Sequence, residues 1–530
     1  MGSSNSESGY LCLILHAHLP YVRHPEYVFA LEEHWLYEAI TESYLPLLRM
    51  MERLVEDGID FRLTFSMSPT LLSMLRDPFL QSRYLNRLES LIELAREEMK
   101  RTAKDPDFHH LAVMYYNRFI QIRDAFVRDY HKDLVEGFKR LMNLGRIEIV
   151  VSAATHAYLP LLSIVPSAVR GQIGVGIRHY EGVFGRKPRG FWLPECGYYP
   201  GVEEVLKGFG IDFAVLETHG ITRADPRPKY SVYAPVCCPC GMAVLGRDPE
   251  SSHQVWSSME GYPGDYDYRE FYRDVAYDLD LDYVGPYVHP DGIRLDTGIK
   301  YYRITGKGNT KKVYRPFRAE GKADGHAGNF VFNRENQIEY LASVMDRKPL
   351  VVAPYDAELF GHWWYEGPLW LERLIRKVHQ ESRSLRLITP SEYLQEYPVN
   401  QVCSPSMSSW GYGGYSEVWL NDSNAWIYPG LHRASSAMEI LARRNPVDDL
   451  EKQALNQAAR EVLLAQASDW PFMISNGKTA PYACTRFKTH LHRFETLEEE
   501  IEAGTIDRNA LLEMERQDNI FAAIDYRSFV

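Results

Sequence analysis

The stretch Gly190-Phe-Trp-Leu-Pro-Glu-Cys-Gly-Tyr-Tyr199 places a single carboxylate, Glu195, just after a short apolar run. The run predicts a strand over 190–193, which Pro194 ends because proline has no N–H to donate within a sheet. A carboxyl group at the mouth of a buried strand is poorly solvated, so its neighbours can tune its pKa. For an isolated glutamate of this kind, a structural ion pair is the simplest interpretation. The rest of the chain changes that interpretation.

Six further apolar runs, each followed by polar side chains, repeat this pattern. They lie at 11–15, 61–65, 147–151, 212–216, 350–353 and 385–388. Such runs predict buried parallel strands, and helical patterns separate most of them. Seven strands indicate an incomplete (β/α) barrel, although periodicity alone is equally compatible with an open doubly wound sheet. Both folds place the active site at the carboxyl ends of the strands. That rule brings together His16, His18, His156, Glu195, His219 and Asp356.

The helical patterns divide the chain further. A barrel region is predicted over 1–400, with a helical insertion over 75–142 in which one apolar face recurs at helical spacing. Helical patterns near 449–467 and 486–502 predict an all-helical C-terminal domain over 401–530. We therefore expect an α/β fold with two helical additions.

Composition excludes several classes of protein. The net charge of −12 argues against a general nucleic-acid binder or a basic membrane-surface protein. No run approaches the length of a membrane span, and Met1 to Ser8 lack the pattern of a signal peptide, so a cytoplasmic enzyme is expected. Cys237, Cys238 and Cys240 cluster, but no CxxC pair recurs at zinc-finger spacing. Small residues in a loop are the simpler interpretation of this cluster.

Glu195 and Asp356 each follow a predicted strand. Two carboxylates that face one cleft are the groups that glycosidic bond cleavage requires. One attacks the anomeric carbon or activates water, and the other protonates the leaving oxygen, which needs a raised pKa. The pair therefore predicts a glycoside-cleaving site.

The pair His16-x-His18 allows a second interpretation. A His-x-His pair after a first strand also binds metal in deacetylases and phosphoesterases. On the motif alone, metal binding and hydrogen bonding to sugar hydroxyls are equally supported. No further tight cluster of Asp and His accompanies the pair, and this favours the sugar-binding role without a metal. His156 and His219, taken singly, are more often core or hydrogen-bonding histidines.

Aromatic residues make up 13% of the chain, with 35 Tyr and 10 Trp. A single tryptophan is usually a core residue, whereas several in polar loops favour stacking on sugar rings. The irregular segment 221–313, rich in Pro, Gly, Tyr and Asp, is expected to form a loop-rich binding surface. The tryptophans near strand ends and in loops are Trp35, Trp192, Trp256, Trp363, Trp364, Trp410 and Trp419.

Four separated motifs, in order, resemble the signature regions of glycoside hydrolase family 57. They are His16-Ala-His-Leu-Pro-Tyr21, Ala154-Thr-His-Ala-Tyr-Leu-Pro160, Trp192-Leu-Pro-Glu-Cys-Gly-Tyr198 and Tyr355-Asp-Ala-Glu-Leu-Phe-Gly-His-Trp-Trp364. Each motif alone is weakly specific, but four in order are a strong signal. Nearly the whole chain, including Ser468-Asp-Trp470, is similar to the family's α-1,4-glucan branching enzyme and amylase-like subgroup.

The resemblance implies an incomplete (β/α)7 barrel with a helical insertion and an all-helical C-terminal domain. It also implies a retaining enzyme of the 1,4-alpha-glucan branching enzyme type, without a metal or other cofactor. Glu195 matches the nucleophile that holds the glycosyl group before its transfer to a 6-hydroxyl, and Asp356 matches the general acid/base. Substrates would be α-1,4-glucans such as amylose, glycogen and maltooligosaccharides. Positions matching glucan-binding residues are His16, His18, His156, Trp192, Arg247, Gly264, Trp410 and Asp469.

One departure concerns the segment between Glu195 and Arg247, where branching members often carry an extended loop with a tyrosine at its tip. Only 52 positions separate the two residues here. Transfer requires that water be kept from the glycosyl-enzyme until an acceptor arrives, so a missing cover favours hydrolysis. The alternative functions that this departure favours are an α-amylase-like hydrolase and a 4-alpha-glucanotransferase. A metal-dependent deacetylase, suggested by the His-x-His pair, is a less favoured alternative. A purely glucan-binding protein would need neither Glu195 nor Asp356, so the presence of both argues against that class. The sequence gives no indication of the oligomeric state.

Overall fold

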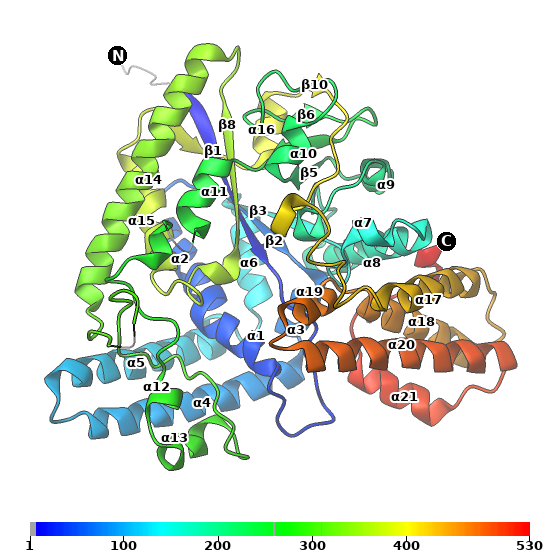
Figure 1. Ribbon diagram of the computed structural model, residues 1–530, viewed down its shortest axis with the longest axis horizontal. Helices are drawn as coiled ribbons and strands as arrows, with labels where there is room; N and C mark the ends of the chain where they lie inside the picture. The colour runs from blue at the N-terminus through cyan, green and yellow to red at the C-terminus, as the bar shows by residue number, and fades with distance from the viewer. Residues whose placement is uncertain (1–6, 258–259, 309) are drawn as a thin grey trace.

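A curved, mostly parallel sheet forms the centre of the larger part of the molecule (Figure 1). The structure is a computed structural model that describes residues 7–257, 260–308 and 310–530. Within these residues, one sheet of ten strands has the order β10-β6-β7-β5-β4-β3-β2-β1-β8, with β9 paired to β1 off this path. The strands of the parallel core are β1 (Gly9–Ala17), β2 (Leu63–Met67), β3 (Ile147–Ser152), β4 (Gly190–Trp192), β5 (Phe213–Leu216), β7 (Ala243–Gly246) and β8 (Leu350–Asp356).

Side chains alternate between the two faces of β1, and both faces are buried. Leu11, Leu13 and Leu15 belong to the large outer core that the helices cover. Tyr10, Cys12 and Ile14 belong to a smaller cluster inside the sheet. Since that inner cluster also contains residues of β7 and β8, the two ends of the parallel path, the sheet curves around it as an incomplete barrel. Burial on both faces explains why the strands read as continuous apolar runs.

The seventh barrel strand is not the one that the sequence suggested. The predicted strand at 385–388 forms β9 (Leu385–Leu387), which pairs only with Gly9–Leu11 at the start of β1. The place next to β5 is taken by β7, inside the segment that was expected to be irregular. The apolar run of β7, Met242 to Leu245, stands between Pro239-Cys-Gly241 and Gly246-Arg-Asp-Pro249, so the surrounding turn residues made the whole stretch look like a loop. The short strands β6 (Val236–Cys237) and β10 (Gln401–Val402) extend the sheet beyond it.

Helices cover the outer face of the barrel. Those beside the strands are α1 (Glu33–Ala39), α2 (Leu45–Glu56), α3 (Pro69–Leu75), α7 (Leu159–Leu162), α8 (Pro166–Phe184), α9 (Val202–Gly208), α10 (Thr218–Thr222), α11 (Pro249–Trp256), α14 (Pro316–Val344), α15 (Gly367–Gln380) and α16 (Pro390–Glu396). Short π-helical and 3-10 segments are η1 (Ile40–Tyr44), η2 (Ala125–Asp129), η3 (Pro194–Cys196), η4 (Tyr262–Gly264), η5 (Ala357–Leu359), η6 (Tyr412–Gly414) and η7 (Tyr526–Phe529).

A pair of long helices, α4 (Pro78–Arg101) and α5 (Pro106–Asp124), projects between β2 and β3 and is followed by α6 (Leu134–Asn143) (Figure 1). Asp77 and Asp105 begin the two long helices, because each carboxylate accepts hydrogen bonds from backbone N–H groups of the first turn. The residue after each of them is proline, which suits the first helical position.

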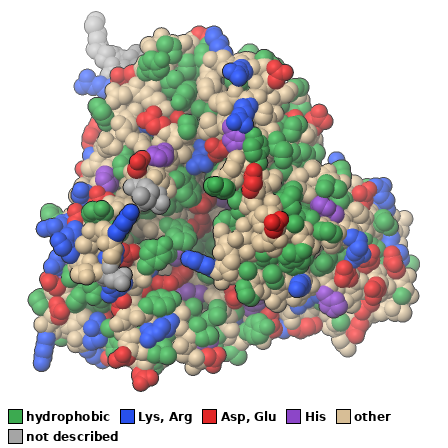
Figure 2. Space-filling view, in the orientation of Figure 1, with side chains coloured by type: hydrophobic (Ala, Val, Ile, Leu, Met, Phe, Trp, Pro, Cys, Tyr) green, Lys and Arg blue, Asp and Glu red, His purple; other side chains and the backbone are tan. Residues whose placement is uncertain are grey.

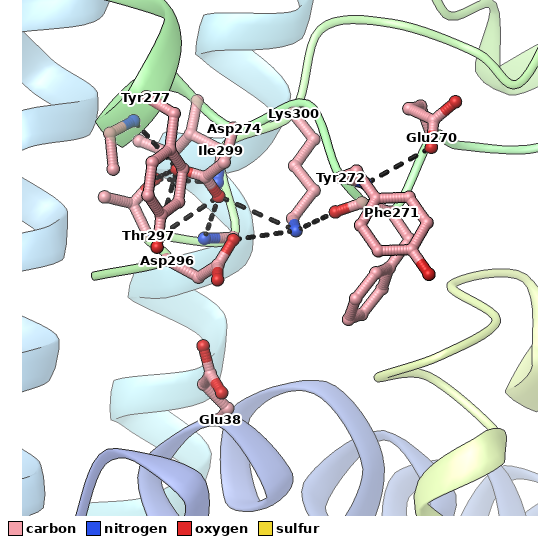
Figure 3. A network of polar contacts seen from close by, with 12 residues as sticks. Glu38, Glu270, Phe271, Tyr272, Asp274, Tyr277, Asp296, Thr297, Ile299 and Lys300 are labelled. Carbon is pink, nitrogen blue, oxygen red and sulfur yellow. Dashed lines mark hydrogen bonds and ion pairs between the residues drawn. The ribbon is translucent and has the colours of Figure 1, made fainter. Parts of the chain in front are cut away.

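Part of the chain between α11 and α14, including α12 (Val275–Asp278) and α13 (Leu281–Val288), lies over this helix pair (Figure 1). A buried polar network anchors it (Figure 3). The Asp274 carboxylate accepts hydrogen bonds from the backbone N–H groups of Ala276, Thr297 and Gly298. The buried Lys300 ammonium donates to the Phe271 carbonyl and lies 3.9 Å from Asp274. This network fixes the segment although it has little regular structure.

The C-terminal region is helical and lies to one side of the barrel (Figure 1). It contains α17 (Ile427–Ala442), α18 (Asp449–Ala465), α19 (Asp469–Asn476), α20 (Ala480–Ala503) and α21 (Arg508–Gln517). The helices expected near 449–467 and 486–502 correspond to α18 and α20, whereas α17, α19 and α21 were not predicted individually. The start of α19 reaches the barrel, where Ala467 forms a bridge with Ala157. Among the described residues, no helix combines the length and apolarity needed to cross a membrane.

Candidate active site

A cavity of about 670 Å³ lies at the carboxyl ends of the strands, between the barrel and the start of α19. Figure 2 shows the surface hollowed near the centre of the face in view. The cavity is lined by His16, His18, Leu19, His156, Glu195, Arg247, Trp256, Asp356, Glu358, Trp363, Trp410, Gly411, Tyr412, Val418, Trp419, Asp469, Phe472 and Asn476. Four of these residues, Glu195, Asp356, Glu358 and Asp469, carry carboxyl groups that can donate or accept protons in the cavity.

Glu195 reaches the cavity through a strained turn. It follows β4 with φ 62° and ψ 22°, and Cys196 also has a positive φ of 50°. Left-handed backbone is uncommon for residues other than glycine and is typical of functional sites. Trp410 Nε1–H donates to Glu195 Oε2 at 2.8 Å, and the Ser468 hydroxyl donates to Oε1 at 3.3 Å. Burial raises the pKa of Glu195, and the hydrogen bond from Trp410 opposes that effect.

Asp356 is in a different environment. It ends β8, in register with His16 on β1. Among the residues that the structure describes, none donates a hydrogen bond to its carboxylate. Burial holds the pKa of Asp356 well above its usual range, and the nearby charges of Glu358 and Glu195 raise it further. Asp356 is therefore the carboxyl group of the pair that retains its proton more readily.

Glu358 lies two residues further along the same motif, with its side chain also in the cavity. Its Oε1 accepts hydrogen bonds from the Tyr44 hydroxyl and from the backbone N–H of His18. Burial raises the pKa of Glu358. These contacts hold its charge close to Asp356.

His16 and His156 meet behind Glu195. Their Nε2 atoms lie 3.0 Å apart. His16 Nδ1 is 3.0 Å from the Ser66 hydroxyl, and His156 Nδ1 is 3.0 Å from the Ser468 hydroxyl. Burial holds the pKa of both histidines well below the usual range, so both imidazoles are neutral.

His18 faces the C-terminal helices. Its Nδ1 is 2.9 Å from the Ser68 hydroxyl, and its Nε2 is 3.2 Å from Asp469 at the start of α19. Both ring nitrogens of His18, like those of His16, thus contact protein groups. The His-x-His pair is arranged for hydrogen bonding.

Within the described residues, three potential metal ligands come within 4.8 Å of one another at Glu461, His490 and Asp518, in the C-terminal helices. The Asp518 carboxylate contacts Arg493, and Arg486 lies 3.6 Å from it. Two guanidinium groups therefore already balance the charge that would attract a cation. The cluster fits a buried ion-pair network better than a metal site.

Aromatic side chains form much of the cavity wall. Trp363 is 56% exposed and stacks on Phe271, with ring centroids 4.8 Å apart. Trp419 is buried against Tyr158, with centroids 4.4 Å apart. Exposed indole rings beside carboxylates suit the apolar faces and the hydroxyl edges of sugar rings.

Polar contacts fix Arg247 in the wall of the cavity. Its Nη1 forms an ion pair of 2.9 Å with Glu217, and its Nε donates to the Ser252 hydroxyl at 2.8 Å. Its guanidinium also lies 5.8 Å from the ring centre of Trp410. The cation therefore faces the cavity without pairing with Asp356 directly.

Most of the sequence-predicted site residues meet in this cavity: His16, His18, His156, Glu195, Arg247, Asp356, Trp410 and Asp469. Trp192 lies behind it and stacks on His16 at 4.7 Å between centroids. Of the tryptophans predicted to stack on sugars, Trp256, Trp363 and Trp419 also line the cavity. The remaining predicted residues lie elsewhere. Trp35 packs edge-on against Tyr482, Gly264 ends η4, and the His219 ring contacts the Gly414 carbonyl.

Sequence reasoning missed several cavity residues. Glu358 stands inside a quoted motif, and Ser468 directly precedes Asp469. Phe472 and Asn476 follow Asp469 at helical spacing on α19, so they share its face and could have been found from that pattern. Tyr412 lies in a loop that gives no such signal.

The cysteine cluster lies away from these groups. Cys237 belongs to β6, and its carbonyl accepts a hydrogen bond from the backbone N–H of Cys403 beside β10. All seven cysteines are free thiols, and none lines the cavity.

Comparison with known proteins identifies the family. Residues 12–406 match the family model described as glycosyl hydrolase family 57, and residues 430–529 match the model of the 1,4-alpha-glucan branching enzyme C-terminal region. A 1,4-alpha-glucan branching enzyme of Thermococcus kodakarensis is 33% identical over 97% of this chain and 78% of its own length.

Two solved structures share the whole architecture. The alpha-amylase AmyC of Thermotoga maritima is 43% identical, with a TM-score of 0.92 over 98% of this chain and 99% of its own. A branching enzyme of Pyrococcus horikoshii is 33% identical, with a TM-score of 0.89 over 99% and 97% of the two chains. Since the first family model spans more than half of the sequence and its four motifs meet in one cavity, the chain belongs to glycosyl hydrolase family 57.

Proposed function

We propose that the protein is a retaining α-glucan-active enzyme of the 1,4-alpha-glucan branching enzyme type. It cleaves an α-1,4 bond, holds the glucan on Glu195 and transfers it to a 6-hydroxyl of an acceptor chain. Support comes from the branching enzymes of Thermococcus kodakarensis and Pyrococcus horikoshii, which match over nearly the full chain, and from the match of residues 430–529 to the branching enzyme C-terminal model.

The observation that carries this proposal is the unequal environment of the two carboxyl groups. Glu195 accepts hydrogen bonds from Trp410 and Ser468, and such bonds favour the ionised form. The buried Asp356 has a pKa well above its usual range, which favours the protonated form. Paired acids whose environments separate their protonation states divide into nucleophile and general acid. We assign Glu195 as the nucleophile and Asp356 as the acid that protonates the leaving oxygen and later deprotonates the acceptor.

Both parts of the chain contribute to this site. We propose a catalytic barrel over 1–400 with a helical insertion at 75–142, and a C-terminal domain over 401–530. The barrel supplies both carboxyl groups, and the C-terminal domain supplies Trp410 and Asp469. The substrate would be a soluble α-1,4-glucan such as amylose or glycogen, handled in the cytoplasm without a metal or other cofactor.

A second candidate function is α-amylase-like hydrolysis. The alpha-amylase of Thermotoga maritima is 43% identical to this chain, compared with 33% for the two branching enzymes. The connection from Glu195 to Arg247 is also short, and most of it forms α9, β5, α10, β6 and β7. Little of it remains to cover the cavity against water.

The assignment is tested by separating the two carboxyl groups with two substrates. Glu195→Gln should lower turnover of both amylose and an α-glucosyl fluoride by roughly a thousandfold or more, because no glycosyl-enzyme can form. Asp356→Asn should lose amylose turnover but keep much of the fluoride turnover, since fluoride leaves without protonation. Glu203→Gln, which removes a buried carboxylate bonded to Tyr198 outside the cavity, is the matched control. Full activity in Glu195→Gln would refute the assignment.

A further inference from the structure

A row of buried polar side chains leads from the barrel to Glu195. Ser66 on β2 contacts His16, His16 contacts His156, His156 contacts Ser468, and Ser468 contacts Glu195 Oε1. The four separations, in that order, are 3.0, 3.0, 3.0 and 3.3 Å. The row joins two barrel strands to the residue that precedes α19.

The hydrogen-bonding capacity of these groups gives the row one polarity. An ionised Glu195 only accepts, so the Ser468 hydroxyl must donate to it. The Ser468 oxygen then accepts from His156 Nδ1–H. A neutral imidazole that donates at Nδ1 accepts at Nε2, and therefore His16 Nε2–H donates to His156 Nε2. His16 Nδ1 in turn accepts from the Ser66 hydroxyl.

Burial of the four side chains favours neutral imidazoles and therefore this direction of hydrogen bonding. Ser66, His16, His156 and Ser468 are all at most 3% exposed. A proton added to His156 would place two N–H groups against each other across the 3.0 Å contact between the Nε2 atoms. A proton added to His16 would go to Nδ1, which would then no longer accept from the Ser66 hydroxyl. Both imidazoles stay neutral because burial opposes their charge.

The backbone holds the junction between the two parts of the chain. Ser468 N–H donates to the His156 carbonyl at 3.2 Å, and the neighbouring Ala157 and Ala467 form a bridge. His156 itself has a φ of 56°, in the left-handed region. Strain of about 1–3 kcal/mol at such a residue persists only where the surroundings enforce it. Here it directs the imidazole toward Ser468.

We propose that Ser468, His156 and His16 form a hydrogen-bonded relay of fixed polarity that positions the Glu195 carboxylate, with His156 held as the Nδ1–H tautomer and His16 as the Nε2–H tautomer. The inference rests on the proposed function of Glu195 as nucleophile. All three are positioning residues, and Ser468 supplies the one donor to Oε1 among the described residues.

The polarity is compatible with the whole reaction cycle. When one carboxylate oxygen bonds to the anomeric carbon, the leaving oxygen takes the proton of Asp356 and the other carboxylate oxygen becomes an ester carbonyl. That carbonyl still accepts a hydrogen bond, so no proton in the row has to move. A preorganised donor of this kind costs no reorganisation during the reaction.

Removing the Ser468 hydroxyl tests the relay. Ser468→Ala should lower kcat/KM for both amylose and an α-glucosyl fluoride by roughly 10- to 100-fold, as expected for a lost hydrogen bond to a charged group. The acid limb of the pH profile should move to higher pH, because the lost donor had favoured ionised Glu195. Ser468→Thr keeps the hydroxyl and should restore both. Ser163→Ala removes a half-buried hydroxyl that donates to the Pro160 carbonyl outside the cavity and should change neither.

Other charges near Glu195 stay in place in these variants. The titratable or charged groups around it are His16, His18, His156, Tyr158, Glu217, Arg247, Asp356, Glu358 and Asp469. An unchanged kcat/KM and acid limb in Ser468→Ala would overturn the relay. If Glu195→Gln remained inactive in the same assays, the proposed function would still stand.

The tautomers give a readout in the parent protein that does not depend on the activity of any variant. In protein labelled with 15N-histidine, the His156 signal should report protonation at Nδ1 and the His16 signal protonation at Nε2. Signals that disappear in His156→Gln and His16→Gln assign the two residues. An Nε2–H tautomer of His156, or a cationic imidazole at neutral pH, would refute the relay.

Discussion

Trp410 holds Glu195 at two points. Its indole Nε1–H donates to Glu195 Oε2 at 2.8 Å, and its backbone N–H donates to the Glu195 carbonyl at 3.0 Å. Together they fix both the side chain and the strained backbone of the proposed nucleophile. Trp410 follows the barrel strands in sequence, so the closing segment of the chain completes a site that the barrel begins.

Replacing Trp410 by Phe should therefore reduce activity while keeping an aromatic ring in the cavity. The loss of a charge-assisted hydrogen bond predicts a fall in kcat of roughly 10- to 100-fold. Steady-state kinetics on maltooligosaccharides would measure it. Trp426→Phe is the matched control, since that indole donates to the Ser423 carbonyl outside the cavity. Equal kinetics in the two variants would show that the bond to Glu195 does not matter.

The charge of Glu358 should set the alkaline limb of the pH profile. Asp356 must be protonated to act as an acid, so activity is lost as the pH rises through its pKa. Burial is the largest cause of that raised pKa, and the Glu358 charge is the next. Glu358→Gln removes the charge, lowers the pKa of Asp356 and should move the alkaline limb to lower pH by about one unit.

Glu372→Gln, on the outer side of α15, provides the comparison for that experiment. Its carboxylate pairs with Arg53 and Arg376 and does not act on Asp356. The alkaline limb should not move in this variant. An alkaline limb that stays in place, or moves to higher pH, in Glu358→Gln would contradict the role given to Asp356.

The network around Lys300 should hold one wall of the cavity (Figure 3). Lys300→Met leaves the buried Asp274 carboxylate without its cation, which costs about 3–5 kcal/mol when a buried pair is broken. Amide hydrogen exchange should speed up in the segment from 266 to 304. KM for amylose should rise, because Phe271 of this segment supports Trp363.

Lys307→Met, at an exposed position just after this segment, is the control. It should change neither exchange nor KM. Exchange rates in Lys300→Met that match those of the parent protein would mean that the network does not stabilise the segment.

Exhaustive chelation should leave the activity unchanged. Each ring nitrogen of His16 and of His18 already contacts a protein group, so the pair offers no free nitrogen to a metal ion. Turnover of amylose before and after chelation measures this. Activity that is lost on chelation and restored by Zn²⁺ would support the metal-dependent alternative.

Much of the fold could be predicted from the sequence because buried parallel strands read as apolar runs. Six of the seven predicted runs form barrel strands, and the polar residues after them converge as the strand-end rule requires. β7 was missed because Pro and Gly on both sides of its short apolar run are typical of a loop. β9 was included because its run looks the same whether it pairs along a full strand or along three residues. Local patterns do not show how long a pairing is.

Part of the site could also be predicted from the sequence. Glu195, Asp356 and the histidines follow strands, so their meeting is a consequence of topology. The contacts of Ser468 and Trp410 with Glu195 depend instead on how the loop before α17 and the start of α19 pack against β4. Helical periodicity cannot give that packing. Trp35 was predicted as one of several tryptophans near strand ends and loops, but it belongs to helix α1 and packs against Tyr482 outside the cavity.

The fate of the glucan on Glu195 is the central claim, and product analysis on amylose tests it most directly. The enzyme would be incubated with amylose, and new α-1,6 branches, counted by debranching, would be compared with new reducing ends. Transfer to a 6-hydroxyl predicts that branches appear while reducing ends stay nearly constant. Reducing ends that rise without any new branches would contradict the branching function and identify an amylase.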